Sequence, residues 1–518
     1  MDNQTSYARR WGLVSSLTFL SRIAGYFRDV VIAYFFGANI QTDAFYVAFR
    51  IPNLLRRLFA EGSLTVAFIP IFTEYNELRG KDEAKKVLNA IFTVLLIILL
   101  LLVILGIIFS PQIIKVFASG FDENTVSLAV KLNRIMFSYL IFISLTALSM
   151  GVLNSIRHFF APAFSPVLFN ISIIGCVFLF GNSFDIPIIS IAVGVLLGGF
   201  LQLILNLYFL KSKDFMFNFT AEFNHPAVKR VCLLIAPQIF GIGVYNLNII
   251  VNTQFASYMP SGTISYLYFA ERLIEFPLGI IAVSIATVML PSLSSDAAAR
   301  RFEAFSQKYS DNLKLMLFIM IPAMFGLIAL GKPICNLLYQ HGEFDSVSVA
   351  KTSQALLGYA FGLFAVGGIR ITVPAFYAIQ NTKTPVIAAF AAFIVNAILC
   401  YVLGFIFNLD HFGLAAASSV SSILNFIILL LYLQKRLGNF VDRELIFFIL
   451  KVTTASFFMG LIVYLISRLY SWQSSDITLE KLLYFIVPIL IGVLFFLAAA
   501  SLLKIKEFSS LTSMISRR

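Results

Sequence analysis

Residues 21–75 read SRIAGYFRDVVIAYFFGANIQTDAFYVAFRIPNLLRRLFAEGSLTVAFIPIFTEY. The stretch is long enough for two membrane crossings, because a spanning helix needs about 20 mostly apolar residues. It nevertheless carries arginines and carboxylates deep inside its apolar runs, where each charge costs on the order of 3 kcal/mol. Charges at that depth face a protein interior or a wet cavity. The stretch therefore predicts membrane helices that enclose a polar site.

The rest of the chain is just as apolar. Of its 518 residues 59% are hydrophobic and 12% are charged, whereas a soluble chain carries about 25% charged residues. The N-terminus lacks a small-residue cleavage site and has Arg22 inside its apolar run, which favours a retained first span over a signal peptide. The four cysteines are isolated, which supports neither a disulfide framework nor a zinc site. No phosphate-binding loop occurs, which argues against an ATP-driven pump. We expect no metal, no cofactor and no enzymatic activity.

Apolar runs recur along the whole length and predict an all-α polytopic membrane protein with fourteen transmembrane helices. The second run is too long for one straight crossing, and Pro52, Gly62 and Pro70 offer places to bend it. The expected spans are roughly residues 11–36, 41–75, 87–112, 127–156, 162–182, 187–210, 230–258, 263–291, 309–331, 352–379, 384–407, 412–434, 445–468 and 482–503.

The charge distribution orients these spans. With the N-terminus inside, the cytoplasmic segments hold most of the 38 Lys and Arg residues, as the positive-inside rule requires. The external loops hold only Lys115, Lys332, Lys351, Arg468 and Lys481. This alternation predicts that both termini are cytoplasmic. It also explains the net charge of +12 without any nucleic-acid partner.

Two parts of the chain resemble each other. Residues 44–75 align with residues 264–296 when Pro70 is matched to Pro291, an offset of 221 residues. Each repeat would hold six spans, and an even number gives two lobes of the same orientation. We expect an N-terminal lobe at 1–220, a second lobe at 221–440 and a pair of extra helices at 441–518.

Basic residues within the spans are the candidate site. Arg22 lies about 16 Å along its span, close to the membrane midplane. An arginine fork donates two hydrogen bonds to a phosphate and keeps its charge when desolvated. We therefore expect an anion site with phosphate or pyrophosphate as ligand, formed by Arg22, Arg28, Arg56 and Arg272.

Carboxylates accompany these arginines, so structural ion pairs are the alternative interpretation. Arg57 with Glu61 and Arg272 with Glu275 have the helical spacing of such pairs. We expect structural roles for Arg50 and Arg57. On an ideal helix Arg22 and Arg28 point about 120° apart, so they would meet on one ligand only if the helix bent, for which Gly25 is available.

The stretch 21–75 closely resembles the opening of the MurJ (MviN) family of lipid II flippases. YFAERLIEFPLGIIAVSIATVMLPSLS (268–294) and NTKTP (381–385) match the same family, and the resemblance covers essentially the whole chain. It implies the two-lobed fold of the MATE-like multidrug, oligosaccharidyl-lipid and polysaccharide exporter superfamily. It further implies alternating-access flipping of lipid II, the undecaprenyl-pyrophosphate-linked disaccharide-pentapeptide, from the cytoplasmic to the periplasmic leaflet of the bacterial inner membrane, for peptidoglycan biosynthesis and cell shape.

The resemblance also assigns residues and partners. The family's important charges fall on Arg22, Arg28, Asp43, Arg56 and Arg272, and its basic position in span ten falls on Arg370. The other charges expected in gating or ion pairs are Asp29, Arg57, Glu61, Glu271 and Glu275. Residues 441–518 would form a groove for the lipid tail. We expect a monomer among membrane lipids, and the resemblance allows cell-wall synthesis proteins as partners.

Other functions make different demands on the residues. A flippase for another polyprenyl-linked glycan would look similar, whereas a cation-coupled multidrug exporter would keep an aromatic cavity with a lone carboxylate. A lipid-phosphate transferase would need paired carboxylates at the membrane surface. Some family members have a sodium site with acidic residues in spans seven and eleven, where this chain offers Asn252 and Asn396. The arginine pattern favours the lipid II flippase.

Overall fold

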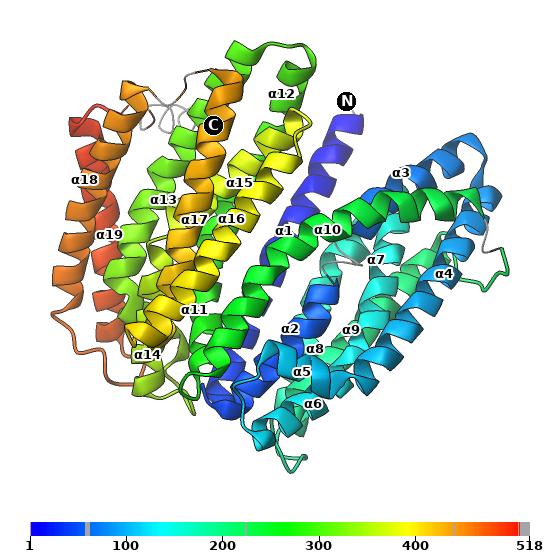
Figure 1. Ribbon diagram of the computed structural model, residues 1–518, viewed down its shortest axis with the longest axis horizontal. Helices are drawn as coiled ribbons and strands as arrows, with labels where there is room; N and C mark the ends of the chain where they lie inside the picture. The colour runs from blue at the N-terminus through cyan, green and yellow to red at the C-terminus, as the bar shows by residue number, and fades with distance from the viewer. Residues whose placement is uncertain are drawn as a thin grey trace. The chain divides into compact units, whose positions relative to one another are not determined.

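The computed structural model describes residues 2–56, 63–222, 225–438, 440, 442–505 and 507, apart from the side chains of residues 2–11, 63–66 and 235–245. Every regular element in these ranges is a helix (Figure 1), which confirms the all-α prediction. The chain divides into two compact units, unit 1 (Met1–Ser261) and unit 2 (Gly262–Arg518).

Unit 1 contains the first ten helices, several of which are shorter than the roughly 20 residues that one membrane crossing needs. The second expected span consists of α2 and α3, with residues 57–62 between them outside the described ranges. The helices are α1 (Asp2–Phe36), α2 (Ile40–Arg56), α3 (Ser63–Leu78), α4 (Lys81–Ile108), α5 (Ser110–Phe117), α6 (Glu123–Phe137), α7 (Tyr139–Ser155), α8 (Phe160–Phe180), α9 (Ile189–Ser212) and α10 (Pro226–Ser257).

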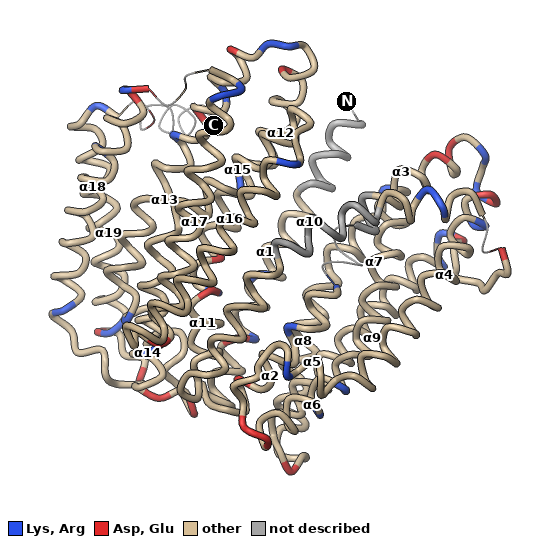
Figure 2. The backbone as a smooth tube through the Cα atoms, viewed as in Figure 1, with Lys and Arg blue, Asp and Glu red and all other residues tan. Residues whose placement is uncertain are grey.

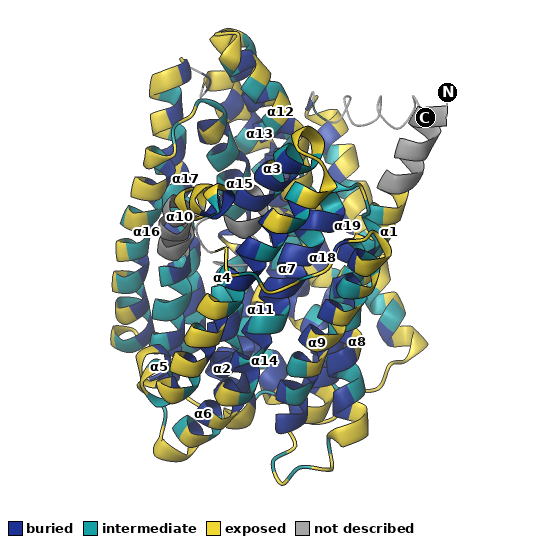
Figure 3. Ribbon diagram, turned by 90° about the vertical axis from the view of Figure 1, so that its right-hand side faces the viewer, coloured by how far each residue is buried: buried dark blue, intermediate teal, exposed yellow. Residues whose placement is uncertain are grey.

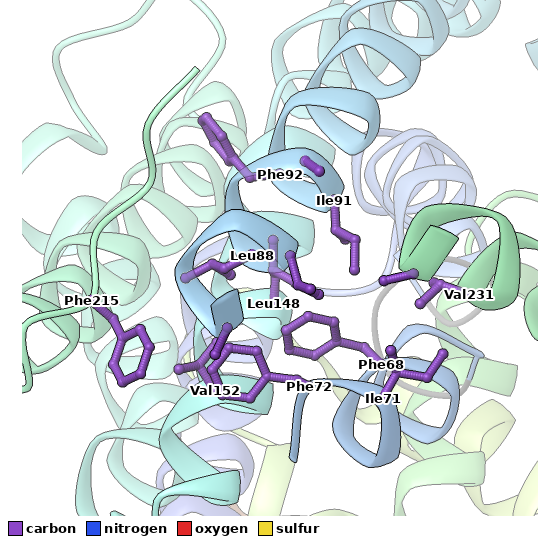
Figure 4. Packing of buried hydrophobic residues seen from close by; sticks show 14 of the residues in the cluster. Phe68, Ile71, Phe72, Leu88, Ile91, Phe92, Leu148, Val152, Phe215 and Val231 are labelled. Carbon is purple, nitrogen blue, oxygen red and sulfur yellow. The ribbon is translucent and has the colours of Figure 1, made fainter. Parts of the chain in front are cut away.

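One hydrophobic cluster joins residues of six of these helices, α3, α4, α7, α8, α9 and α10, and Figure 4 shows part of it. Phe68 and Phe72 of α3 pack with Leu88 of α4, Leu148 of α7 and Val231 of α10, all of them buried. The repeat would make α10 the first span of the second lobe, yet this cluster places it in the core of unit 1. The division into compact units falls at residue 261. The lobe boundary near residue 220, which comes from the sequence repeat, remains a prediction.

Unit 2 contains the remaining helices and two π-helical turns. α14 and α15 bend by 48° at the break between them, so the tenth expected span consists of two helices. The elements are α11 (Thr263–Pro277), η2 (Leu278–Ala282), α12 (Val283–Ala298), α13 (Phe302–Tyr339), α14 (Ser346–Ala360), α15 (Leu363–Ala378), α16 (Lys383–Tyr401), η3 (Val402–Ile406), α17 (Asp410–Leu437), α18 (Arg443–Ser467) and α19 (Leu479–Leu502).

The exact number of fourteen spans is not confirmed. In the described part of the chain, ten helices are long and apolar enough to cross a membrane, or eleven if α14 and α15 form one span. The other three expected spans correspond to α1, the α2–α3 pair and α10. In α1 the charges of Arg22, Arg28 and Asp29 lower the hydropathy, and α2 and α3 are only 17 and 16 residues long.

Helix boundaries extend the sequence repeat well beyond its motif. α13 begins at Phe302, 221 residues after α4 begins at Lys81, and α17 begins at Asp410, 221 residues after α9 begins at Ile189. The π-helical turn η2 lies at the same offset from positions 57–61, between α2 and α3. The second copy of the long motif is therefore interrupted by a π-helical turn, whereas the matching positions 57–61 of the first copy lie outside the described residues.

Candidate substrate-binding site

Arg28 of α1 is held by two neighbours in the interior of unit 1. It is 7% exposed, and its Nε and Nη2 donate to Oδ1 of Asp29 at 3.0 and 2.6 Å. Its Nη1 donates to Oδ1 of Asn170 on α8 at 3.2 Å. Asp29 is 1% exposed, so the pair is buried as a unit. Charge-assisted bonds of this kind fix the direction of the guanidinium group.

One face of α1 contacts Asn170 of α8. Asn170 donates through Nδ2 to the carbonyl oxygens of Pro166 at 2.9 Å and Ser21 at 3.4 Å. A Cβ on Gly25 would lie 3.7 Å from the same nitrogen. Ser21, Gly25 and Arg28 follow the spacing of a single helix face. Asn170 was missed in the sequence, where an amide inside an apolar span was the available signal.

The expected convergence of Arg22 and Arg28 is not seen on α1. α1 continues as one α-helix through Gly25, Arg28 is buried and Arg22 is exposed. The two arginines therefore present different faces of α1, as an ideal helix predicts for residues six positions apart.

α2 carries a carboxylate at its start and an arginine at its end. Asp43 is 3% exposed and lies in the first turn, where a negative charge is favourable at the helix N-terminus. Arg56 is half-buried in the last turn and donates through Nε to Oδ1 of Asn53 at 2.9 Å. Arg50 hydrogen-bonds the hydroxyl of Thr253 on α10, which agrees with its expected structural role. Arg57 and Glu61 lie outside the described residues.

In unit 2 the predicted pair of Arg272 and Glu275 is confirmed. Nη1 of Arg272 lies 2.9 Å from Oε2 of Glu275 on the next turn of α11, and the guanidinium lies over the ring of Tyr268 at 5.6 Å. Glu271 is exposed. Arg370 is half-buried on α15 and forms no hydrogen bond or ion pair within the described part of the chain.

The two units differ in charge balance. Span residues 22–56 of unit 1 carry four arginines against Asp29 and Asp43, an excess of two positive charges. In unit 2 Arg272 and Arg370 are matched in number by Glu271 and Glu275. Among the residues described, no three His, Cys, Asp or Glu side chains gather as metal ligands. This chemistry suits an anion, and unit 1 supplies most of the positive charge.

Comparison with known proteins assigns the family. A family model described as Lipid II flippase MurJ matches residues 32–483. The chain belongs to the MurJ family of lipid II flippases. A protein named Lipid II flippase MurJ from Burkholderia cenocepacia is 38% identical over 82% of this chain and 83% of its own length. The probable lipid II flippase MurJ of Buchnera aphidicola subsp. Schizaphis graminum is 36% identical over 94% of this chain and 95% of its own.

Solved structures agree with this assignment. The structure titled Lipid II flippase MurJ, inward closed conformation, has a TM-score of 0.79 and 33% identity and covers 98% of this chain and 100% of its own. An inward-facing multidrug resistance MATE family transporter of the MOP superfamily has a TM-score of 0.67 over 83% of this chain and 99% of its own, at 16% identity. The second likeness shows the fold alone. The MurJ family is one of transporters, and this member is a multi-pass membrane protein.

Proposed function

We propose that this chain flips lipid II from the cytoplasmic to the external leaflet of a bacterial inner membrane by alternating access. Family membership supports the substrate. The observation that carries the site is the buried guanidinium of Arg28, held by Asp29 and Asn170 inside a unit with an excess of positive charge. A pyrophosphate is the part of lipid II that such charge would recognise.

The binding residues follow from this proposal. Arg22, Arg28 and Arg56 of unit 1 and Arg272 and Arg370 of unit 2 act on the pyrophosphate. Asp43 acts at the N-terminal end of α2, and Asp29 and Asn170 position Arg28 before the substrate enters. Glu271 and Glu275 partner the arginine of α11. Pre-positioned donors lose less conformational entropy on binding, and their positive charge favours an anion over a neutral lipid.

The long lipid tail stays in the membrane throughout the cycle, and α18 and α19 would form its groove. Both termini face the cytoplasm and the chain acts as a monomer, with cell-wall synthesis proteins as further partners. Moving one charge across the membrane is worth about 2.3 kcal/mol per 100 mV. An inside-negative potential therefore helps an empty, positively charged site return to the cytoplasmic side.

The direct test uses cells depleted of their own flippase. Alanine is placed singly at Arg22, Arg28, Arg56 and Arg272, and growth is scored together with the lipid II that reaches the outer leaflet, detected by a membrane-impermeant reagent. Each substitution is expected to abolish growth and lower outer-leaflet lipid II at normal expression. Lys332→Ala, on an exposed cation of α13, is the matched control and is expected to behave as wild type.

Two results would overturn the proposal. Growth of all four variants at wild-type rates would show that these arginines do not form a pyrophosphate site. Failure of the wild-type chain to raise outer-leaflet lipid II, combined with efflux of cationic dyes, would instead indicate a multidrug exporter of the same fold.

A further inference from the structure

Three cations lie at the external end of unit 1, where the positive-inside rule expects few. Lys115 is on α5, Lys131 and Arg134 are on α6, and all three side chains are exposed. Positions 131 and 134 lie one turn apart and share a face of α6. None of the three forms an ion pair in the part of the chain that the structure describes. We call them the external cation cluster.

Two hydrogen bonds bring the helices of this cluster together. Nε of Arg134 donates to the carbonyl oxygen of Ile107 at 3.3 Å, which holds the guanidinium beside the last turn of α4. Next to it, the hydroxyl of Ser110 at the start of α5 donates to Oδ1 of Asn133 at 2.8 Å. Lys115 follows Ser110 by five residues, about 8 Å along α5. Arg134 therefore lies at the junction of α4, α5 and α6, and Lys115 follows on α5.

The nearest carboxylates of α6 do not neutralise the cluster. Asp122 caps the helix, where its Oδ2 accepts from the backbone nitrogens of Asn124 at 3.2 Å and Thr125 at 3.4 Å. Glu123 precedes Lys131 by eight residues, about 12 Å along the helix. Figure 2 shows basic positions on α5 and α6 away from the acidic turns at the helix ends. The positive charge is thus available to an external anion.

An exposed apolar strip on α4 leads to the cluster. Ile97, Leu101, Ile104 and Ile108 are 50%, 58%, 54% and 58% exposed, and their spacing of four, three and four residues places them on one helix face. Figure 3 shows exposed positions along α4. α4 has 28 residues, about 42 Å in length, which matches a bilayer with its headgroups. Its external end therefore lies at headgroup level, with the strip in the acyl layer below.

We propose that α4, α5 and α6 bind an anionic phospholipid of the external leaflet. Its phosphate lies among Lys115, Lys131 and Arg134, and one acyl chain lies along the α4 strip. Charge-assisted hydrogen bonds from guanidinium and ammonium groups supply the headgroup contact. The proposal rests on the orientation given above, with the start of α4 cytoplasmic, and not on the pyrophosphate site.

Lipid retention by the full-length chain tests this site. The protein is purified in mild detergent with equal amounts of dioleoylphosphatidylglycerol and dioleoylphosphatidylcholine, and retained lipid is counted by native mass spectrometry. Wild type is expected to retain phosphatidylglycerol preferentially, and the variant K115Q/K131Q/R134Q to retain at least fivefold less. The matched control K332Q/K351Q/R468Q removes three external cations of unit 2 and is expected to retain the wild-type amount. R134Q alone is expected to show an intermediate loss if the triple variant elutes as aggregate.

Each contrary outcome is specific. Equal retention of the two lipids by wild type, or equal loss in both triple variants, would overturn the site. Displacement of phosphatidylglycerol from the wild type by equimolar undecaprenyl pyrophosphate, together with loss of undecaprenyl pyrophosphate binding in the cluster variant, would assign the cluster to the transported lipid instead. Lipid II flipping by the same variants is measured in cells depleted of their own flippase, so loss of flipping with intact phosphatidylglycerol retention separates the two proposals.

Discussion

Arg28 and Asp29 are chain neighbours on α1 and form a buried ion pair at 2.6 Å, although adjacent helix positions point about 100° apart. The arginine side chain folds back to reach the carboxylate, and Asn170 of α8 holds its other nitrogen. The charge of Arg28 is therefore kept in the apolar interior of unit 1 by two partners. Such an arrangement separates two roles of Arg28, in stability and in binding, which substitutions can distinguish.

Replacing both residues of the pair should restore the stability that is lost when one is replaced, but it should not restore transport. Asp29→Ala leaves a buried arginine without its carboxylate, a change that typically costs about 3–5 kcal/mol. Replacing both residues, as in Arg28→Met with Asp29→Leu, is expected to recover most of the lost thermal stability. Neither variant is expected to flip lipid II, because both disturb the guanidinium that meets the pyrophosphate. Thermal unfolding in detergent and growth of depleted cells measure the two effects.

A double variant that is stable and also supports growth would show that Arg28 serves packing alone. Asn170→Ala is a useful companion, because it removes only the hydrogen bond at 3.2 Å. We expect it to lower transport without the large loss of stability seen in Asp29→Ala.

Arg272 should matter more than the carboxylate that pairs with it. Both partners are partly exposed, with side chains 31% and 39% accessible, and exposed i,i+3 pairs contribute little to stability. Glu275→Gln is therefore expected to support growth, whereas Arg272→Ala is expected to abolish it. Arg272→Lys keeps the charge but loses the planar fork, so we expect weak growth. Equal loss of growth in Glu275→Gln and Arg272→Ala, at equal expression, would point to a structural ion pair.

The sequence predicted the helical class, the repeat and the Arg272–Glu275 pair because each depends on local periodicity. Hydropathy located the apolar runs, and the i,i+3 spacing on α11 left little freedom for the pair. The fold-back of Arg28 onto Asp29 was not predictable in this way, since an ideal helix separates the two directions. Asn170 was missed because its importance comes from α8 packing against Ser21 and Gly25, which is a tertiary relationship.

Tertiary contacts also decide which compact unit contains α10. The repeat places this helix with the second lobe, and nothing local in its sequence argues otherwise. Val231 packs into the α3–α4–α7 cluster and Thr253 meets Arg50, so tertiary contacts place it in unit 1. The exact number of spans is unconfirmed for a related reason, because the arginines that mark a functional site also lower the hydropathy of α1.

The expected structural role of Arg50 can be tested through its hydrogen-bond partner. Its hydrogen bond to Thr253 joins α2 to α10 within unit 1. Thr253→Val keeps the shape of the side chain and removes the hydroxyl, so it is expected to lower thermal stability by about 1 kcal/mol. If Arg50 is structural, Arg50→Gln and Thr253→Val should lower the melting temperature by similar amounts and their effects should not add. Substrate binding by Arg50 would instead abolish growth in Arg50→Gln alone.

The close packing of α8 on α9 should make the thermal stability of unit 1 sensitive to a single added methyl group. A Cβ on Gly194 would lie 2.8 Å from the Cα of Ile173 and 3.2 Å from the Cβ of Cys176, so the helices must separate. Gly194→Ala is expected to cost about 1–3 kcal/mol and lower the melting temperature by a few degrees. It should weaken the Arg28–Asn170 contact as well, because Asn170 precedes Ile173 by one turn on α8. Gly175→Ala is the matched control on the same helix pair, since a Cβ there meets nothing within 4 Å, and its melting temperature should equal or exceed that of wild type. Similar losses in both variants would mean that helix flexibility, and not the α8–α9 contact, sets the stability of unit 1.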